Sequence, residues 1–323
     1  MKYQHYDVFN GDADGICALL QLRLNAPRRS ILISGVKRDN QLLKKISPQQ
    51  GDTVTCLDIS MEKNTNELIN ILNIGCDVFY VDHHKSGDIP MSDKLDTIIN
   101  TDANTCTSLL INEKLDNRYI EWAIVGAYGD NLINVANNLA DSIGLNKEQK
   151  KQLNELGVLI NYNGYGSMLS DLHFDPVILF KMLLNYQSPF EVLSSDTSPY
   201  LALKQGYLRD FKHVENIRPK IKEKNSACYV LPNETWSRRV VGVFSNTLAN
   251  NDPCKAHIVA LEIDKEHYQI SLRSPLNKKY GASDICSQYP SGGGRSGAAG
   301  INSLHKSELV NLSKKVNDYY GVE

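Results

Sequence analysis

The fold of the N-terminal half follows from one stretch, Tyr6-Asp7-Val8-Phe9-Asn10-Gly11-Asp12-Ala13-Asp14-Gly15. Residues 6–10 have the composition of a β-strand, and residues 16–24 have the apolar spacing of a helix. The acidic residues Asp12 and Asp14 are therefore expected in a turn between a strand and a helix. A strand that leads directly into a helix is typical of the βαβ units from which parallel sheets are built.

The same alternation continues to about residue 100. It predicts further strands at 30–35, 52–58 and 77–81 and a helix at 64–72. Sites in open α/β sheets form at the carboxyl ends of the strands, so we expect the polar clusters at these ends to converge. Three such clusters follow predicted strands, namely residues 10–15, Leu57-Asp58-Ile59 and Val81-Asp82-His83-His84.

The residue pattern in the second half of the chain predicts a helical segment first and mainly strands after it. Residues 121–211 have largely helical periodicity, and the last predicted elements are strands at 227–231, 239–244, 257–263 and 268–272 and a helix at 306–320. The expected fold class is α/β, with a mostly parallel sheet in an N-terminal domain, a smaller C-terminal α/β domain and a cleft between them. We place the N-terminal domain at 1–190, a helical linker at 191–224 and the C-terminal domain at 225–323.

Composition restricts the kinds of partner. The 323 residues include 35 basic and 37 acidic side chains, a net charge of -2, which argues against binding to duplex nucleic acid. The N-terminus lacks an apolar signal core, and no apolar run approaches the roughly 18 residues of a membrane span. We therefore expect a cytoplasmic protein without membrane contact, whose nucleic-acid substrate, if it has one, is short. An oligomer is compatible with this composition.

The acidic turn after the first strand resembles a calcium loop only in part. An EF-hand also alternates oxygen ligands before a glycine, but its twelfth position would here be Gln21 instead of glutamate, and a strand precedes the turn instead of a helix. Helix capping would account for one of Asp12 and Asp14 but not for both. A metal site at the edge of the sheet explains the pair better.

Adjacent histidines behind an apolar strand strengthen this interpretation. His83 and His84 are costly to pack, and imidazole is a common ligand of transition metals. With Asp58 and Asp130, the candidate ligands become four carboxylates and at least one imidazole. This mixture suits two Mn²⁺ ions roughly 3.5 to 4 Å apart, with Mg²⁺ as the alternative, that activate a water and bind a phosphoryl group.

The series Asp12-x-Asp14, Asp58, Asp82-His83-His84 and Asp130 resembles the four motifs of the DHH phosphoesterase superfamily. The resemblance implies that Asp12 and Asp14 each hold a different ion and that Asp58 bridges both. It also implies that His83 and Asp130 complete one ion, that His84 faces the phosphate and that Asp82 orients the histidines. Asp82 and His84 are thus the catalytic candidates, and the other five residues are the metal-ligand candidates.

One position departs from the family pattern. Many members carry a ligand histidine four residues before the first aspartate, and Val8 stands there in this chain. One ion therefore has one protein ligand fewer. The form Asn10-x-Asp12-x-Asp14-Gly15 is similar instead to the Asp-x-Asp-x-Asp-Gly arrangement of RecJ-like exonucleases.

A glycine-rich stretch near the C-terminus, residues 291–300, is a candidate phosphate-binding segment. The backbone of Gly292, Gly293 and Gly294 can approach an anion closely, and Arg273 and Arg295 are suited to phosphate recognition. The alternative is a flexible surface loop. The pattern resembles the DHHA1 substrate-binding domain, in which a histidine is usual at the position of Arg295. Lys37-Arg38, at a strand end, could contact substrate, but we expect this pair to be solvated.

Together the two resemblances imply a phosphoric ester hydrolase, a phosphodiesterase that cleaves short RNA or linear dinucleotides to mononucleotides. The alternatives are a phosphatase for 3′-phosphoadenosine 5′-phosphate, a single-strand exonuclease and a polyphosphatase. A nucleotide sensor without activity is the alternative from a different class, since Val8 and Arg295 both depart from the usual motifs.

Overall fold

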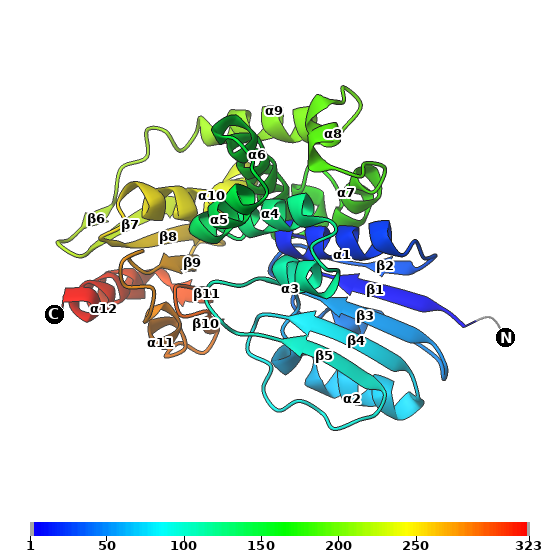
Figure 1. The fold of residues 1–323 in the computed structure, drawn as a ribbon. Coiled ribbons are helices and arrows are strands. Elements are labelled where there is room, and N and C mark those ends of the chain that lie inside the picture. Colours follow the sequence, from blue (N-terminus) through cyan, green and yellow to red (C-terminus); the bar gives the residue numbers. More distant parts are fainter. Residues whose placement is uncertain (1–2, 322–323) are drawn as a thin grey trace. The chain divides into compact units, whose positions relative to one another are not determined.

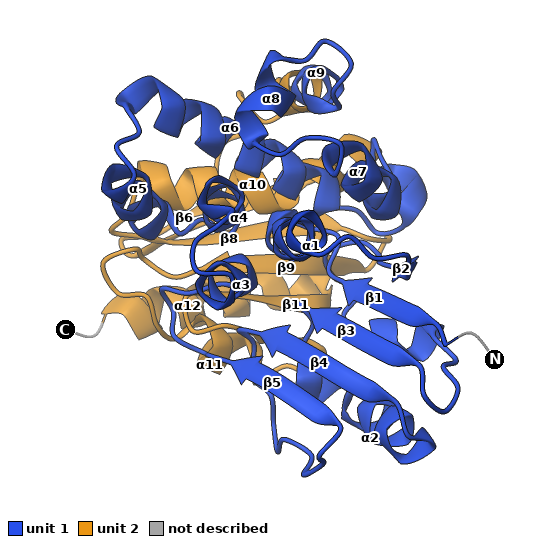
Figure 2. Ribbon diagram, turned by 45° about the vertical axis from the view of Figure 1, so that its right-hand side comes forward, with its two compact units in different colours: residues 1–206 blue, residues 207–323 orange. Residues whose placement is uncertain are grey.

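The computed structural model describes residues 3–321. These residues divide between 206 and 207 into two compact units (Figure 2). The division falls within the stretch 191–224, inside helix α9 (Tyr200–Phe211). Each unit has its own sheet, and the two sheets are separate.

The first unit is built on a five-stranded parallel sheet with the order β2-β1-β3-β4-β5 (Figure 1). Four of these strands were predicted from the sequence, and β5 (Leu95–Ile99), at the sheet edge, was not. The predicted strands are β1 (His5–Phe9), β2 (Ile31–Ile33), β3 (Thr53–Leu57) and β4 (Asp77–Asp82).

Side chains alternate between the two faces of this sheet. Tyr6 and Val8 of β1 lie in an apolar cluster with residues of helix α2 (Thr65–Ile74) and of the short helices η1 (Leu42–Lys45) and η2 (Met61–Lys63). Asp7, between them, points to the opposite face and pairs with Arg23 of helix α1 (Ala13–Asn25). Successive residues of β1 therefore contact different helical layers, as expected for a parallel sheet that is covered by helices on both faces.

The helical segment after the sheet has the predicted character. Its helices are α3 (Thr107–Lys114), α4 (Ile120–Gly129), α5 (Ile133–Ser142), α6 (Lys147–Gly164), α7 (Pro176–Leu183), α8 (Pro189–Ser194) and α9, with η3 (Leu169–Asp171) between α6 and α7. The close approach of α4 and α6 depends on glycine. A Cβ atom on Gly157 would lie 2.4 Å from the carbonyl oxygen of Val125 and 2.9 Å from the backbone nitrogen of Gly129.

The second unit has a six-stranded sheet with the order β10-β11-β9-β8-β7-β6. Only β7 and β8 are parallel, and helix α10 (Thr235–Asn251) connects them. Helices α11 (Ala282–Cys286) and α12 (Leu309–Gly321), the latter preceded by η4 (Lys306–Glu308), contribute to the apolar core of this unit. The strands are β6 (Ile221–Lys222), β7 (Ser226–Leu231), β8 (Ala256–Glu262), β9 (His267–Arg273), β10 (Gly292–Gly294) and β11 (Ala298–His305).

One predicted element of this unit was wrong. Residues 239–244, expected as a strand, lie within α10. Residues 240–245 are all buried, and a short continuous buried run does not distinguish a helix from a strand in the sequence. The α/β fold class itself, with a parallel sheet first and a second sheet later, is confirmed.

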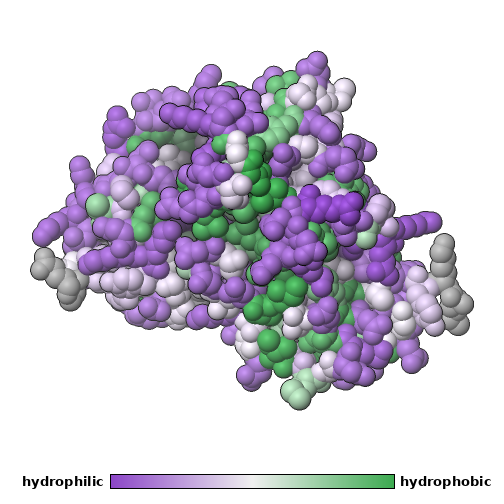
Figure 3. All heavy atoms as spheres, in the orientation of Figure 1, coloured by the Kyte–Doolittle hydropathy of each residue, from purple (hydrophilic) through white to green (hydrophobic). Residues whose placement is uncertain are grey.

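The helices do not have the properties of a membrane span. Within residues 3–321, none combines the length and the apolar character required to cross a bilayer. The face of the molecule in Figure 3 is mostly hydrophilic, with smaller hydrophobic areas between the polar side chains.

Candidate metal centre

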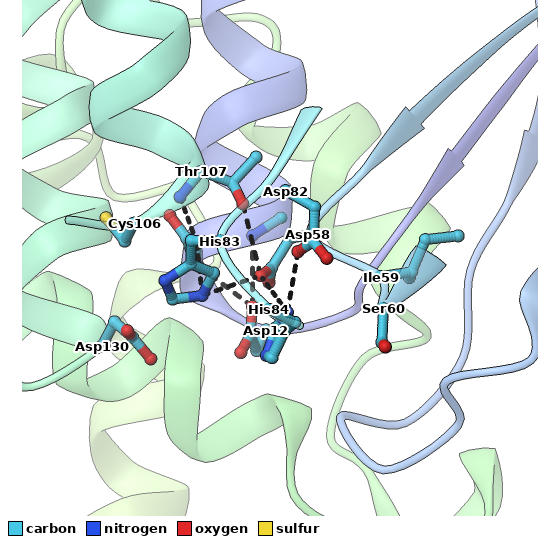
Figure 4. A network of polar contacts seen from close by, with 12 residues as sticks. Asp12, Asp58, Ile59, Ser60, Asp82, His83, His84, Cys106, Thr107 and Asp130 are labelled. Carbon is cyan, nitrogen blue, oxygen red and sulfur yellow. Dashed lines mark hydrogen bonds and ion pairs between the residues drawn. The ribbon is translucent and has the colours of Figure 1, made fainter. Parts of the chain in front are cut away.

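The candidate metal centre lies at the carboxyl ends of three adjacent strands, β1, β3 and β4. Backbone pairing continues into the residues that follow the strands. The N–H of Asn10 donates to the carbonyl of Leu57 (3.1 Å), and the N–H of Asp58 donates to the carbonyl of Val81 (3.0 Å). Figure 4 shows the side chains of Asp12, Asp58 and His83 close together, with Asp130 to one side. The sheet therefore brings the predicted strand-end clusters together.

Asp58 is held in a conformation that most residues avoid. Its φ of 58° lies in the left-handed region, and its side chain is buried. Burial, with the nearby charges of Asp12 and Asp14, raises the pKa of Asp58 well above its ordinary value. Among the residues that the structure describes, nothing donates a hydrogen bond to its Oδ2 atom. Backbone strain and an unsatisfied buried oxygen are both costly, and both are typical of functional sites.

His83 presents a lone pair to this carboxylate. Its Nδ1 atom lies 2.9 Å from the carbonyl oxygen of Thr105, which can only accept, so Nδ1 carries the proton. Nε2 lies 3.3 Å from Oδ1 of Asp58 and 3.6 Å from Oδ2 of Asp14. A neutral imidazole directed in this way is repelled by carboxylate oxygens unless a proton or a cation lies between them. The donor set around His83 therefore fits a divalent ion.

His84 is oriented by a different contact. Its Nδ1 lies 2.7 Å from Oδ1 of the buried Asp82, and its side chain is 31% exposed. Asp58, His83 and His84 each offer one ligand atom, and these atoms all lie within 4.8 Å of one another. Asp82 thus contacts His84, and its role in orienting the histidines stays a prediction.

Asp12 and Asp14 have different local roles although only one residue separates them. Oδ1 of Asp12 accepts the N–H groups of Asp14 and Gly15, both at 3.1 Å, and so caps helix α1. Asp14 instead accepts the N–H groups of Thr107 (2.8 Å) and Ser108 (2.7 Å) at the first turn of α3. Capping accounts for Asp12 alone, and the positive end of a second helix fixes Asp14.

Lys37, which we expected to be solvated, lies inside the cluster instead. Its ammonium forms an ion pair with Oδ2 of Asp12, donates to Oδ1 of Asn161 at 3.1 Å and lies 3.9 Å from Oδ1 of Asp130. Burial alone would lower the pKa of Lys37, but the charges of Asp12 and Asp130 raise it above its ordinary value. The sequence contained a signal for this position, because Lys37 follows a predicted strand of the same sheet.

Val8 and Asp130 are the two remaining N-terminal positions that the sequence singled out. Val8 is fully buried in the apolar cluster on the α2 face and offers no ligand atom. Asp130 follows the last residue of α4, and its side chain is 5% exposed. All five predicted metal ligands are thus on one unit, and their function as ligands stays a prediction.

The predicted substrate-binding residues lie on the second unit. Gly292–Gly294 is not a loop but strand β10, which pairs with β11, and Arg295 occupies the turn between them. The start of β11 pairs with Arg273 at the end of β9, so the turn and Arg273 belong to the same end of the sheet. Nε of Arg273 donates to Oδ1 of Asn246 at 2.7 Å, and Nη1 donates to Oγ of Ser271 at 3.0 Å. Phosphate binding by these residues stays a prediction.

Comparison with known proteins gives similarity in structure but not in sequence. No family model and no curated protein matches the sequence. Solved structures do match. A pGpG-specific phosphodiesterase, PggH from Vibrio cholerae, is 14% identical with a TM-score of 0.54, and the match covers 99% of each chain. RecJ from Thermus thermophilus, in complex with Mn²⁺, is 15% identical with a TM-score of 0.61, over 98% of this chain but 52% of RecJ.

An exopolyphosphatase-related protein from Bacteroides fragilis is also similar, at 15% identity and a TM-score of 0.51, over 98% of this chain and 92% of that one. At these identities the similarity establishes the fold. The predicted α/β fold, with a parallel sheet first and a second sheet later, is therefore confirmed and is shared with these solved structures.

Proposed function

We propose that this chain is a metal-dependent phosphodiesterase that hydrolyses linear dinucleotides or short oligoribonucleotides to mononucleotides. The observation that carries the proposal is the pair formed by Asp58 and His83. Oδ2 of Asp58 is buried without a donor, Oδ1 of the same carboxyl group lies 3.3 Å from Nε2 of His83, and a divalent cation would satisfy both residues.

The residues divide between two ions. Asp14, Asp58, His83 and Asp130 would hold the first ion, which we call the Asp14 site. Asp58 and Asp12 would hold the second, which we call the Asp12 site. We propose Mn²⁺ as the ion, with Mg²⁺ as the alternative, since the oxygen-rich donor set suits both. When bound, such ions supply a water of lowered pKa and neutralise charge on the phosphoryl group.

The remaining side chains of the cluster would act on the substrate and on the ligands. His84 is the partly exposed imidazole of the group and is proposed to contact the substrate phosphate. Asp82 accepts a hydrogen bond from Nδ1 of His84 and so fixes the ring and its tautomer. The first turn of α3 holds Asp14 in the same way through two backbone donors.

The second unit is proposed to bind the substrate. Arg273 and Arg295 belong to one end of its sheet, beside the β10–β11 turn, and a guanidinium can bind a phosphate through two parallel hydrogen bonds. Gly293 leaves open space where a Cβ atom would lie, so the backbone of β10 is accessible there. These features support a phosphate-binding role for Gly292, Gly293, Gly294 and both arginines.

Two observations support a short substrate. The chain matches the Vibrio cholerae pGpG phosphodiesterase over the full length of both proteins, whereas it spans about half of the Thermus RecJ. Its net charge of -2 also does not favour a long polyanion. We therefore propose pGpG or a related linear dinucleotide as the substrate to test first.

The test is a panel of substrates with the purified chain and Mn²⁺. The panel contains pGpG, other dinucleotides, oligomers of increasing length, 3′-phosphoadenosine 5′-phosphate and polyphosphate. The proposal expects the highest kcat/KM for dinucleotides. A rate that rises with oligomer length would indicate an exonuclease. A preference for 3′-phosphoadenosine 5′-phosphate would indicate a phosphatase, and a preference for polyphosphate would indicate a polyphosphatase. Tight binding without turnover would indicate a sensor.

A further inference from the structure

The ammonium of Lys37 divides the acidic cluster into two unequal halves. Asp12 already has a cationic partner, because its Oδ2 atom forms an ion pair with Lys37 while Oδ1 accepts two backbone donors. In the described part of the chain, the ion pairs of Asp14 and Asp58 are with imidazoles alone. The permanent positive charge of Lys37 therefore lies directly against Asp12, and it is farther from Asp130, at 3.9 Å.

Lys37 is held in this position from several sides. Its side chain is 20% exposed, its ammonium donates to Oδ1 of the buried Asn161 at 3.1 Å, and the ring centroid of Tyr165 lies 5.5 Å away. Its backbone N–H donates to the carbonyl of Gly164 at 2.8 Å. A lysine fixed by an ion pair, a hydrogen bond and a cation–π contact is positioned and not merely attracted to the nearest acid.

The same half of the cluster has few protein ligands. Val8, which stands where a ligand histidine is expected, offers none, and only Asp12 and Asp58 remain. A divalent ion there would have two carboxylates, one of which is already neutralised. At the Asp14 site, by contrast, Asp14, Asp58 and Asp130 contribute oxygens and His83 a nitrogen.

We propose that Lys37 is the resident cation of the Asp12 site, so that a divalent ion can bind there only by displacing the ammonium. This inference rests on the proposed function, because it concerns the second of the two ions. It predicts that the chain binds one Mn²⁺ tightly, at the Asp14 site, and a second one much more weakly. Lys37 is thus a residue that sets metal affinity, and it is not itself a metal ligand.

The test measures metal binding without substrate. Mn²⁺ is titrated into metal-free protein, and the free ion is quantified from its electron paramagnetic resonance signal. Wild-type protein should show two classes of site whose Kd values differ by roughly tenfold or more. The weaker site requires displacement of the Lys37 ammonium from Asp12, and the loss of a charge–charge contact at this range lowers affinity by at least that factor. Lys37→Met should strengthen the weaker site by roughly tenfold and the tighter site by a smaller factor, because Lys37 pairs with Asp12 but lies 3.9 Å from Oδ1 of Asp130.

A matched control removes the same charge from the same region. Lys45→Met deletes an ammonium that pairs with Asp39 outside the cluster and should change neither Kd. Asn161→Leu keeps every charge but removes one hydrogen bond to Lys37, and it should strengthen the weaker site by a smaller factor. This second variant keeps the test valid if Lys37→Met does not fold.

The possible results separate the two proposals. Two equally tight sites in the wild type, or an unchanged weaker site in both Lys37→Met and Asn161→Leu, would overturn the role of Lys37 while leaving the proposed function intact. Absence of any Mn²⁺ binding by the folded wild-type protein would overturn the proposed function itself.

Discussion

Nε2 of His83 lies 3.3 Å from Oδ1 of Asp58, and the opposite nitrogen of the same ring donates to the carbonyl of Thr105. The second contact fixes the tautomer, and the first directs a lone pair at a carboxylate. The two groups repel each other unless a proton or a cation lies between them, and a divalent cation would interact favourably with both. The relationship between these two side chains is the basis of the proposed metal centre.

Asp58→Asn is expected to abolish Mn²⁺-dependent stabilisation while leaving the protein folded. Asparagine tolerates the left-handed φ of 58°, and it removes a buried negative charge beside Asp12 and Asp14. The melting temperature in EDTA should therefore rise, and the further rise on addition of Mn²⁺ should disappear. Thermal unfolding followed by circular dichroism measures both. Asp96→Asn, an exposed substitution on β5, is the control and should keep the Mn²⁺ effect.

A buried ion pair on the other face of the sheet gives a pH dependence of stability. Burial alone would raise the pKa of Asp7, but hydrogen bonds from Arg23 and His5 lower it to about 2, from 3.8. A lowered folded pKa contributes stability that is present above pH 3.8 and is lost as the pH falls through about 2. The shift corresponds to about 2 kcal/mol.

Comparison with Asp7→Asn isolates this contribution. The variant leaves Arg23 buried without its charged partner, so it should be less stable than the wild type at pH 6. The gap in the free energy of unfolding should shrink by about 2 kcal/mol between pH 5 and pH 2, as measured by urea denaturation. A gap that stays constant over this range would contradict the assignment.

Gly157→Ala is expected to destabilise the first unit. The added Cβ atom would lie 2.4 Å from the carbonyl oxygen of Val125, so helices α4 and α6 would have to separate. Overpacking of this kind costs about 1 to 3 kcal/mol. Because Asp130 directly follows α4, Mn²⁺ affinity should fall as well. Denaturation and Mn²⁺ titration check the two effects, and a wild-type free energy of unfolding would show that the helices adapt without cost.

Arg295→Ala tests the substrate role of the second unit. Loss of a charge-assisted hydrogen bond worth roughly 1.5 to 3 kcal/mol should raise KM by about tenfold or more with nearly unchanged kcat. Gly293→Ala fits the fold without a steric conflict and should raise KM if the backbone of β10 approaches the phosphate. Lys314→Ala, on the exposed face of α12, removes a positive charge elsewhere and should change neither constant. Wild-type kinetics in both test variants would leave β10 and its turn a purely structural hairpin.

The sequence predicted correctly those features that depend on residues close together in the chain, such as alternation within a strand and polar residues at its end. Alternating residues identified β1, β3 and β4, and the polar residues after them are the ones that the sheet brings together. Period two also explains why Asp7 and Val8 face different layers. These features depend on side-chain spacing along a single strand, which a sequence displays directly.

The sequence was misleading where tertiary packing decided the outcome. Val240, Val241 and Phe244 are typical strand residues, but they belong to the continuous buried run 240–245 of the 17-residue helix α10. The glycines of β10 have low strand propensity and are in a strand because β11 offers them backbone partners. Lys37 was missed because its partners Asn161 and Tyr165 come from a helix end more than 120 residues away.

We propose that the Asp58–His83–His84 cluster makes this chain a metal-dependent phosphodiesterase. The most direct measurement is chromatographic analysis of pGpG incubated with EDTA-treated protein, before and after addition of Mn²⁺, with Asp58→Asn in parallel. The account predicts conversion to mononucleotides by the wild type only when Mn²⁺ is present, and none by Asp58→Asn under either condition. Equal hydrolysis without metal, or wild-type turnover by Asp58→Asn, would contradict it.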